Sequence, residues 1–244
     1  MSTGRRHTVV VTRAATQSAG LSERLERVGY HVLEVPVIQI ADAQDGGAAL
    51  DAALARLASY DWLVVTSPNG AARVRDAYAS LATDQRPRLA AVGPGTAAAL
   101  GVPVDVVATD SVGEGLVAAM PPGPGRVLVA QAEAARDVVR DGLSRLGWTV
   151  DSVIAYRTVP AVVSPQLLRD AAASDAVVFT SGSTIRAFLA AAGTGGVPPV
   201  VVSIGPATSR VAEELGLRVT VTAAVHNLDG VVDAVQSVLP PVED

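Results

Sequence analysis

The 244-residue sequence contains no cysteine, no lysine and only three histidines. The absence of cysteine excludes disulfides, thiolate nucleophiles and cysteine-ligated metals. The absence of lysine excludes the Schiff base of the usual pyridoxal-phosphate enzymes and the Walker-type phosphate loop. His7, His31 and His226 show no metal-ligand spacing and are interpreted as surface or loop residues. We therefore expect no metal and no cofactor.

Long apolar runs and excess positive charge are also missing. No segment approaches the roughly 18 uninterrupted apolar residues of a membrane-spanning helix. The opening MSTGRRHT runs directly into a strand-like VVVT, without the pattern of a signal peptide. The 19 basic residues are all arginines, and the net charge of -5 argues against general nucleic-acid binding. We expect a cytoplasmic protein with neither a membrane nor a nucleic-acid partner, although local arginines and backbone N–H groups could still bind an anion.

What the sequence does contain is an internal repeat. AVGPGTAAALG at 91–101 is matched by SIGPATSRVAEELG at 203–216, and three other pairs of blocks follow in the same order around them. Each copy alternates Val/Ile/Leu-rich strands with helical stretches, which predicts parallel sheets with helices on both faces. The sequence therefore predicts a tandem duplication of an α/β unit. The other paired blocks are 8–40 with 126–158, 60–78 with 175–192, and 103–120 with 217–235.

Small and polar residues follow the predicted strands where each one leads into a helix. Ligands of open parallel sheets bind outside the carboxyl ends of the strands. Unpaired N–H groups at a helix start attract carboxylate or phosphate, although each such segment alone also fits an ordinary cap or turn. These segments are Thr12-Arg13, Thr66-Ser67-Pro68, Gly93-Pro94, Thr180-Ser181-Gly182 and Gly205-Pro206.

Together these segments resemble the uroporphyrinogen-III synthase family over nearly the whole chain, from Val9 to Val235. The resemblance is carried by Thr12-Arg13, the turns VTSPNG and FTSGS, VGPGTA, SIGPATS, and Tyr156 in AYRT. It implies a hydro-lyase that cyclises hydroxymethylbilane to uroporphyrinogen III, with inversion of the terminal pyrrole ring, on the way to haem, sirohaem and cobalamin. It implies no cofactor, because the pyrroles supply the electrons.

The family fold implies two similar α/β domains with parallel sheets flanked by helices, joined by a two-stranded hinge that the chain crosses twice. The first domain would hold 1–36 with 159–244, and the second 41–153. The hinge strands would be 37–40 and 154–158, and the cleft between the domains would take the substrate. We expect a monomer, with a transient contact to the preceding pathway enzyme as a further possibility.

The resemblance also implies the site residues. Tyr156 is the expected catalytic residue, which assists departure of the substrate hydroxyl; taken alone, it would be interpreted as a strand tyrosine packing at the hinge. Arg13 and Arg136 are expected to pair with acetate and propionate groups. The full set of expected substrate-binding residues is Arg13, Ser67, Gly70, Thr96, Arg136, Ser181, Gly182, Ser183, Gly205, Ala207 and Thr208.

The sequence departs from the family pattern at two places. Asn69 stands where many members have a charged residue, and Gln131-Ala132 replaces an Arg-Gly often found after that strand. These departures leave the individual carboxylate partners open.

Two other functions compete with this interpretation. Residues 93–98 formally fit the G-x-G-x-x-A dinucleotide fingerprint, but they lie mid-domain instead of in the first strand-helix turn, and the second copy has Ala207 in place of the second glycine. A non-enzymatic bilobal binding or regulatory module could use the same fold, since fold does not determine function.

Overall fold

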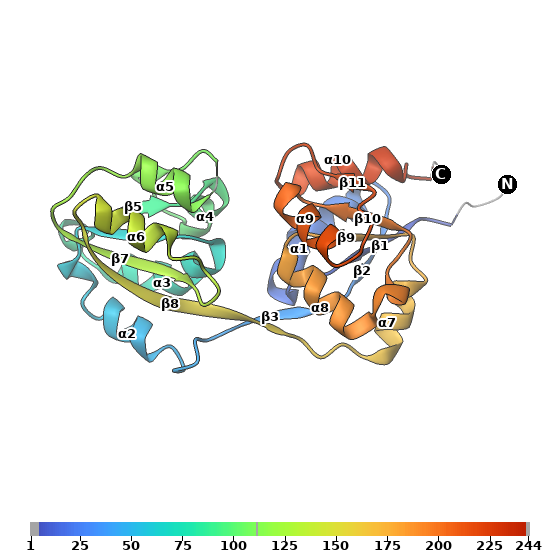
Figure 1. Cartoon of the computed structure of the whole chain (residues 1–244), viewed down its shortest axis with the longest axis horizontal. Coiled ribbons are helices and arrows are strands. Elements are labelled where there is room, and N and C mark those ends of the chain that lie inside the picture. Colours follow the sequence, from blue (N-terminus) through green and yellow to red (C-terminus); the bar gives the residue numbers. More distant parts are fainter. Residues whose placement is uncertain (1–4, 111, 243–244) are drawn as a thin grey trace. The chain divides into compact units, whose positions relative to one another are not determined.

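The structure is a computed structural model that describes residues 5–110 and 112–242. The chain divides into two compact units, Met1–Gln39 with Val159–Asp244, and Ile40–Thr158 (Figure 1). The predicted first domain also includes residues 1–4 and 243–244, and the fourth repeat block includes Ser111; these lie outside the described residues.

The first unit contains a parallel sheet of five strands in the order β11-β10-β9-β1-β2. A short 3-10 helix, Thr194–Gly196, precedes β10. The other elements are β1 (Thr8–Val11), α1 (Ala15–Arg27), β2 (His31–Glu34), α7 (Pro165–Ala172), β9 (Ala176–Phe179), α8 (Gly182–Ala192), β10 (Val200–Ser203), α9 (Pro206–Glu214), β11 (Val221–Thr222) and α10 (Leu228–Val238).

The second sheet has six strands in the order β3-β8-β7-β4-β5-β6, and the pairs from β8 to β6 are parallel. Short 3-10 helices occupy Leu57–Ser59 and Thr83–Gln85. The other elements are β3 (Ile38–Ala41), α2 (Ala48–Leu54), β4 (Trp62–Val65), α3 (Pro68–Ser80), β5 (Arg88–Ala91), α4 (Pro94–Leu100), β6 (Val106–Val107), α5 (Gly113–Ala119), β7 (Arg126–Ala132), α6 (Val138–Arg145) and β8 (Thr149–Pro160).

The two crossings of the chain involve β3 and β8, which are neighbours in the second sheet. The boundaries between the units fall within these two strands, after Gln39 and after Thr158. The expected hinge segments, 37–40 and 154–158, overlap these strands, and their action as a hinge stays a prediction.

The predicted α/β fold with two parallel sheets flanked by helices is confirmed. The order β2-β1-β9-β10-β11 in the first sheet corresponds to β8-β7-β4-β5-β6 in the second, which is the pairing that the aligned sequence blocks predict. In the first unit α1 packs with α10 and α8 with α9, while in the second α6 packs with α5 and α3 with α4. Each sheet is therefore covered on both faces, as buried parallel strands require.

The cores follow from the strand sequences. Val9, Val10 and Val11 of β1 are fully buried, and alternate residues serve opposite faces of the sheet. Leu63 and Leu128 belong to the cluster beneath α3, whereas Val64 and Val129 belong to the cluster beneath α5 and α6. A chain with 3% aromatic residues thus builds its layers from aliphatic side chains.

The repeat extends to backbone conformation. Gly29 and Gly147, which the sequence aligns, both follow a helix and both have positive φ, at 97° and 91°. Glycine adopts this left-handed conformation without the steric cost that a Cβ would bring. Each is followed by a buried aromatic residue, Tyr30 or Trp148. Among the residues described, no helix is both long and apolar enough to span a bilayer.

Candidate functional site

The carboxyl edge of the second sheet carries the starts of several helices. Ser67 follows β4 and caps α3: its side-chain oxygen accepts a hydrogen bond of 3.0 Å from the backbone N–H of Gly70. Gly93 is the N-cap of α4, and Pro94 occupies its first turn. The edge therefore presents helix N-termini, whose partial positive charge favours anions.

A cavity of about 280 Å³ lies at this edge. It brings together three of the predicted site residues, Ser67, Arg136 and Tyr156, from three different elements or loops. The remaining lining is mostly apolar: Thr66, Val92, Val112, Gly113, Gln131, Ala132, Ala135, Val138 and Val139.

A β-bulge determines the placement of Tyr156. The register of β7 against β8 shifts between Gln131, which pairs with Ile154, and Ala132, which pairs with Tyr156. Ala155 is therefore the extra residue on β8, and both Ala155 and Tyr156 are buried in the same hydrophobic cluster. Regular alternation would have put these neighbours on opposite faces, so the bulge redirects a side chain at the edge of the cavity.

The hydroxyl group of Tyr156 has no hydrogen-bond partner among the described residues, although the residue is only 6% exposed. The other three tyrosines are all partnered. The Tyr30 hydroxyl donates to the carbonyl of Leu239, Tyr60 to Asp151 at 2.6 Å, and Tyr78 to the carbonyl of Pro87 at 3.2 Å. Buried tyrosine hydroxyls normally find such partners. Tyr156 is thus a buried ring with an unused polar group beside a cavity.

Gln131, the penultimate residue of β7, is a second unpartnered group in the cavity. It is 9% exposed, and its side-chain oxygen Oε1 is fully buried and accepts no hydrogen bond from any residue that the structure describes. Sequence reasoning noted Gln131 only as a departure from the family pattern and did not place it in the site. The available signal was a polar side chain near the end of an otherwise apolar strand, RVLVAQA.

Arg136 lines the cavity, and its guanidinium group already forms an ion pair. Its two terminal nitrogens donate to Glu114 at 2.9 and 3.2 Å. A hydrogen bond from the backbone amide of Glu114 itself, and then the one from Arg136, hold the pKa of this carboxyl below its usual value. A substrate carboxylate would have to share Arg136 with Glu114 or displace it.

Gly70 and Thr96 lie near this edge but do not line the cavity. Gly70 is buried, and its N–H is engaged by Ser67. Thr96 is the third residue of α4, nearly buried, and it does not cap the helix because the N-cap is Gly93. Within the described residues its hydroxyl has no hydrogen-bond partner.

The carboxyl edge of the first unit repeats this pattern. Ser181 caps α8, accepting from the N–H of Thr184 at 3.4 Å, and its hydroxyl lies 2.9 Å from that of Ser183. A Cβ on Gly182 would approach Val211 within 2.9 Å, so this glycine allows α8 to pack closely against α9.

Arg13 follows β1 at the same edge. It is half-buried and forms no ion pair or hydrogen bond with the described residues. Burial lowers the pKa of its guanidinium from the ordinary value, yet an arginine stays protonated in a protein at neutral pH. It is therefore a cation available to an anionic ligand.

The second Gly-Pro turn has the same geometry as the first. Gly205 is the N-cap of α9 in an extended conformation, with φ 179° and ψ 172°, against 177° and 174° for Gly93. Ala207 is exposed, while Thr208 is 6% exposed and its hydroxyl has no partner among the described residues. Neither Thr96 nor Thr208 caps its helix, because the N-caps are Gly93 and Gly205.

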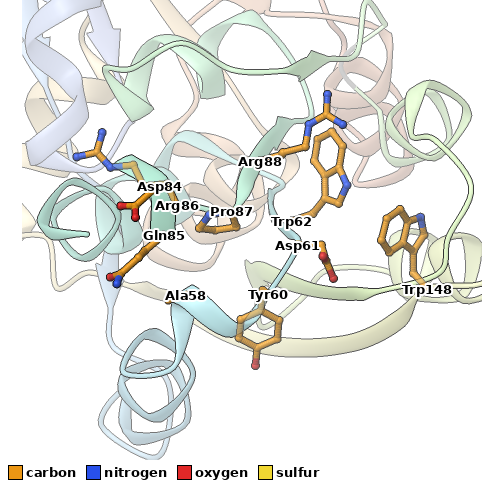
Figure 2. Close-up of a pocket in the computed structure, with 10 residues that line it drawn as sticks. All are labelled: Ala58, Tyr60, Asp61, Trp62, Asp84, Gln85, Arg86, Pro87, Arg88 and Trp148. Carbon is orange, nitrogen blue, oxygen red and sulfur yellow. The ribbon is translucent and has the colours of Figure 1, made fainter. Parts of the chain in front are cut away.

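A larger hollow, of about 430 Å³, opens at the amino-terminal edge of the second sheet (Figure 2). Its walls include both tryptophans, Trp62 and Trp148, each less than 10% exposed. The guanidinium of Arg88 lies 4.7 Å from the ring centre of Trp62, and Trp148 donates its indole N–H to the carbonyl of Pro121 at 2.8 Å. The aromatic faces are thus already packed.

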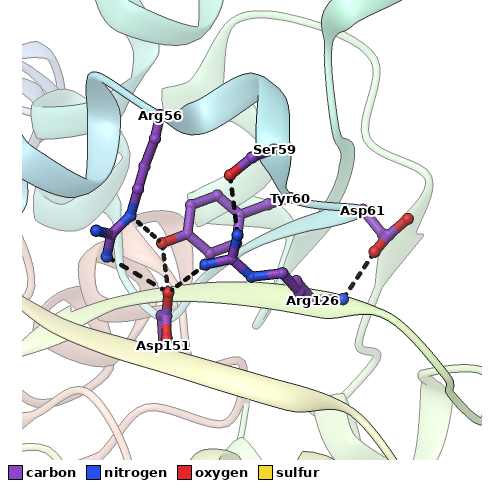
Figure 3. A network of polar contacts seen from close by, with 6 residues as sticks. All are labelled: Arg56, Ser59, Tyr60, Asp61, Arg126 and Asp151. Carbon is purple, nitrogen blue, oxygen red and sulfur yellow. Dashed lines mark hydrogen bonds and ion pairs between the residues drawn. The ribbon is translucent and has the colours of Figure 1, made fainter.

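The charges next to this hollow form a closed network (Figure 3). Asp151 accepts hydrogen bonds from Tyr60 at 2.6 Å, Arg126 at 3.0 Å and Arg56 at 3.5 Å. Asp61 accepts from the backbone N–H of Arg126 at 2.7 Å. Partnered groups of this kind stabilise structure, and this edge is not the ligand edge of a parallel sheet. No three His, Asp or Glu side chains in the described part of the chain are grouped to hold a metal ion.

The fold and this edge define a class: an α/β protein made of two corresponding parallel-sheet units, each with helix starts suited to anions at its carboxyl edge. Comparison with known proteins specifies the class further. The family model described as uroporphyrinogen-III synthase HemD matches residues 19–233.

Two curated relatives match most of the chain. A uroporphyrinogen-III synthase of Synechococcus elongatus is 32% identical, with 94% of each chain covered. The chloroplastic enzyme of that name from Oryza sativa is 27% identical over 95% of this chain and 80% of its own. The chain belongs to the uroporphyrinogen-III synthase family, as the sequence motifs predicted, and its function is that of this hydro-lyase of tetrapyrrole biosynthesis.

Solved structures agree at the level of the fold. A mutant uroporphyrinogen III synthase of Thermus thermophilus is similar with a TM-score of 0.61 at 17% identity, covering 95% of this chain and 98% of its own. The Helicobacter pylori protein gives a TM-score of 0.60 at 16% identity, covering 95% and 99%.

Proposed function

We propose that the protein cyclises hydroxymethylbilane to uroporphyrinogen III, releasing water and inverting the terminal pyrrole ring. Family membership over nearly the whole chain supports the reaction. The observation that supports this site is the hydroxyl of Tyr156, which has no partner among the described residues and lies at a cavity on the carboxyl edge of its sheet.

Tyr156 acts as the general acid in this proposal. Its O–H donates to the departing hydroxyl of the substrate's hydroxymethyl group, which leaves as water and generates an azafulvene. The substituted carbon of the last pyrrole attacks this electrophile and forms a spiro intermediate, which fragments and recloses with the ring inverted. Because the Tyr156 hydroxyl has no partner within the described chain, it can supply this proton, whereas the hydroxyl of Tyr60 already donates to Asp151.

The remaining predicted residues bind the substrate's carboxylates. Among the residues that the structure describes, Arg13 is a half-buried cation without a partner, and the hydroxyls of Thr96 and Thr208 at the starts of α4 and α9 form no hydrogen bond. Helix N–H groups and such donors bind carboxylates without lysine. The rate advantage comes mainly from holding a flexible linear tetrapyrrole in one folded geometry.

Incubation with freshly prepared hydroxymethylbilane tests the function. Because uncatalysed closure proceeds without inversion, isomer analysis of the oxidised porphyrin should show type III in excess, growing with protein concentration. A product mixture identical to that of the protein-free control would refute the proposal, and would favour the non-enzymatic binding module.

The setting of the enzyme is proposed from the sequence. We propose a cytoplasmic monomer that makes a transient contact with the preceding enzyme of the pathway. Sedimentation of the protein alone and with that enzyme tests both statements about assembly.

A further inference from the structure

The side-chain amide of Gln131 is the least satisfied buried group that the structure describes. Its oxygen is fully buried without a partner, and the side chain forms no other hydrogen bond with the described residues. A buried polar atom without a partner destabilises a protein, so such groups are rare and call for an explanation. In this case the residue lines the same cavity as Tyr156.

The protein groups around the cavity offer little to satisfy this oxygen. Arg136 donates to both oxygens of Glu114. No donor of the described lining forms a hydrogen bond with the oxygen of Gln131, and this includes the hydroxyls of Ser67 and Tyr156. The other lining side chains are mainly those of valine and alanine. The missing donor therefore comes from outside the protein, either as water or as a ligand.

We propose that the amide oxygen of Gln131 accepts a hydrogen bond from a pyrrole N–H of the substrate and holds that ring in the cavity. The inference rests on the proposed function. Ionised carboxylates of a polypyrrole only accept hydrogen bonds, so its donors are the ring N–H groups and the single hydroxymethyl O–H. The ring N–H groups are the donors that remain in the product after the hydroxyl has left as water. The valine side chains of the lining suit the apolar faces of a pyrrole ring.

A neutral amide suits this task better than a charged side chain. A carboxylate would accept the N–H more strongly, but it would place a buried negative charge beside a substrate that carries many carboxylates. An arginine would present only donors to a ring that needs an acceptor. The oxygen is fully buried, so it accepts from a ligand in the cavity after a half-turn of the amide, which exchanges the positions of its oxygen and nitrogen.

The test is a pair of measurements on Gln131→Met, which keeps an unbranched side chain of similar length and removes both polar atoms. The dissociation constant for uroporphyrinogen III, titrated anaerobically, should rise about three- to tenfold because one hydrogen bond is lost. The melting temperature of the free protein should stay the same or rise, because the variant removes an unsatisfied buried group. Gln131→Glu should weaken product binding more than Gln131→Met does, through charge repulsion.

Gln85→Met provides the matched control, because Gln85 is an exposed glutamine that lines the hollow at the opposite edge of the sheet. It should leave product binding unchanged. Unchanged product binding by Gln131→Met would overturn the inference and assign the amide to water. Weaker binding together with a lower melting temperature would also overturn it, by showing a structural role. Failure of the unchanged protein to form the type III isomer would refute the proposed function itself, a result that the isomer assay shows separately.

Discussion

The two edges of the second sheet show what distinguishes a functional site from a hollow. The amino-terminal edge has the larger hollow, about 430 Å³ against about 280 Å³, and contains both tryptophans. The carboxylate of Asp151 next to this hollow is nevertheless engaged, since it accepts hydrogen bonds from a tyrosine and two arginines. At the carboxyl edge the smaller cavity holds two buried polar groups, on Gln131 and Tyr156, that lack partners among the described residues.

The difference follows from what each edge does for the fold. The ion pairs and hydrogen bonds around Asp151 join β8 to the segment before β4 and to the start of β7, and so they stabilise the fold. Binding a ligand requires polar groups that the protein leaves unsatisfied, and this costs stability. Unused hydrogen-bonding capacity, and not volume, is therefore the feature that supports the proposed site.

The strongest test of the difference between the two edges removes one tyrosine hydroxyl at each of them. Tyr156→Phe should slow turnover by up to about a hundredfold, the lower range of general acid catalysis, because the azafulvene also forms without help. Its melting temperature should change little, since no hydrogen bond is lost. Turnover of hydroxymethylbilane and thermal melts measure the two effects.

Tyr60→Phe is the matched control at the other edge. It should keep turnover and lose stability, because the hydroxyl of Tyr60 donates to Asp151. Equal turnover of Tyr156→Phe and the unchanged protein would reduce Tyr156 to a packing residue of β8.

The next largest effect is expected at Asp151, whose network of hydrogen bonds and ion pairs contributes to stability and not to turnover. Asp151→Ala should lower the free energy of unfolding by about 1–2 kcal/mol, because it leaves Tyr60 and Arg126 without their acceptor. The figure is at the low end because the carboxylate is 32% exposed and solvent screens its ion pairs. Urea unfolding of the variant measures it, and a large loss of turnover without loss of stability would contradict the structural assignment.

The same carboxylate predicts a pH dependence. The hydrogen bond from Tyr60, followed by Arg126 and Arg56, holds the pKa of Asp151 below its usual value. A depressed folded-state pKa stabilises the protein above the unfolded value of about 3.9, and this contribution is lost as pH falls through the lower folded-state pKa. The difference in unfolding free energy between the unchanged protein and Asp151→Ala should therefore shrink below about pH 4. A difference that grew on acidification would contradict the assigned direction.

The two serine caps at the carboxyl edges of the sheets are expected to differ in how much they stabilise the protein. Ser67→Ala should cost about 1 kcal/mol of stability, the usual value of a serine cap. Ser181→Ala should cost less, because its contact with the helix N–H is longer, 3.4 Å against 3.0 Å. Chemical denaturation of the two variants side by side checks the order, and a reversed order would show that the hydroxyl pair with Ser183 dominates.

The smallest effects on stability are expected at Thr96 and Thr208. Neither caps its helix, so Thr96→Ala and Thr208→Ala should each shift the free energy of unfolding by less than about 0.5 kcal/mol. Product affinity should still fall about threefold or more, since a free hydroxyl is removed. Variants that melt earlier and bind product normally would show that these turns are scaffolding.

Much of the fold was determined by the sequence alone. The aligned blocks predicted two corresponding parallel sheets, and the strand orders confirm this down to the matched glycines Gly29 and Gly147. The reason is local: valine-rich runs predict buried strands, and strand-helix alternation admits few topologies. The motif order also identified the family, which the family model and the curated relatives confirm.

The site depended on tertiary structure. Sequence could not reveal that a bulge places Ala155 and Tyr156 in one cluster, since alternation predicts opposite faces. Nor could it reveal that Arg136 is paired with Glu114, 22 residues away, while the side-chain oxygen of Gln131 has no partner in the described part of the chain. Periodicity reports which residues are buried, but whether a buried polar atom is satisfied depends on every neighbour that the fold brings near it. The family could therefore be identified from the sequence, whereas the polar groups without hydrogen-bond partners could be found only in the folded structure.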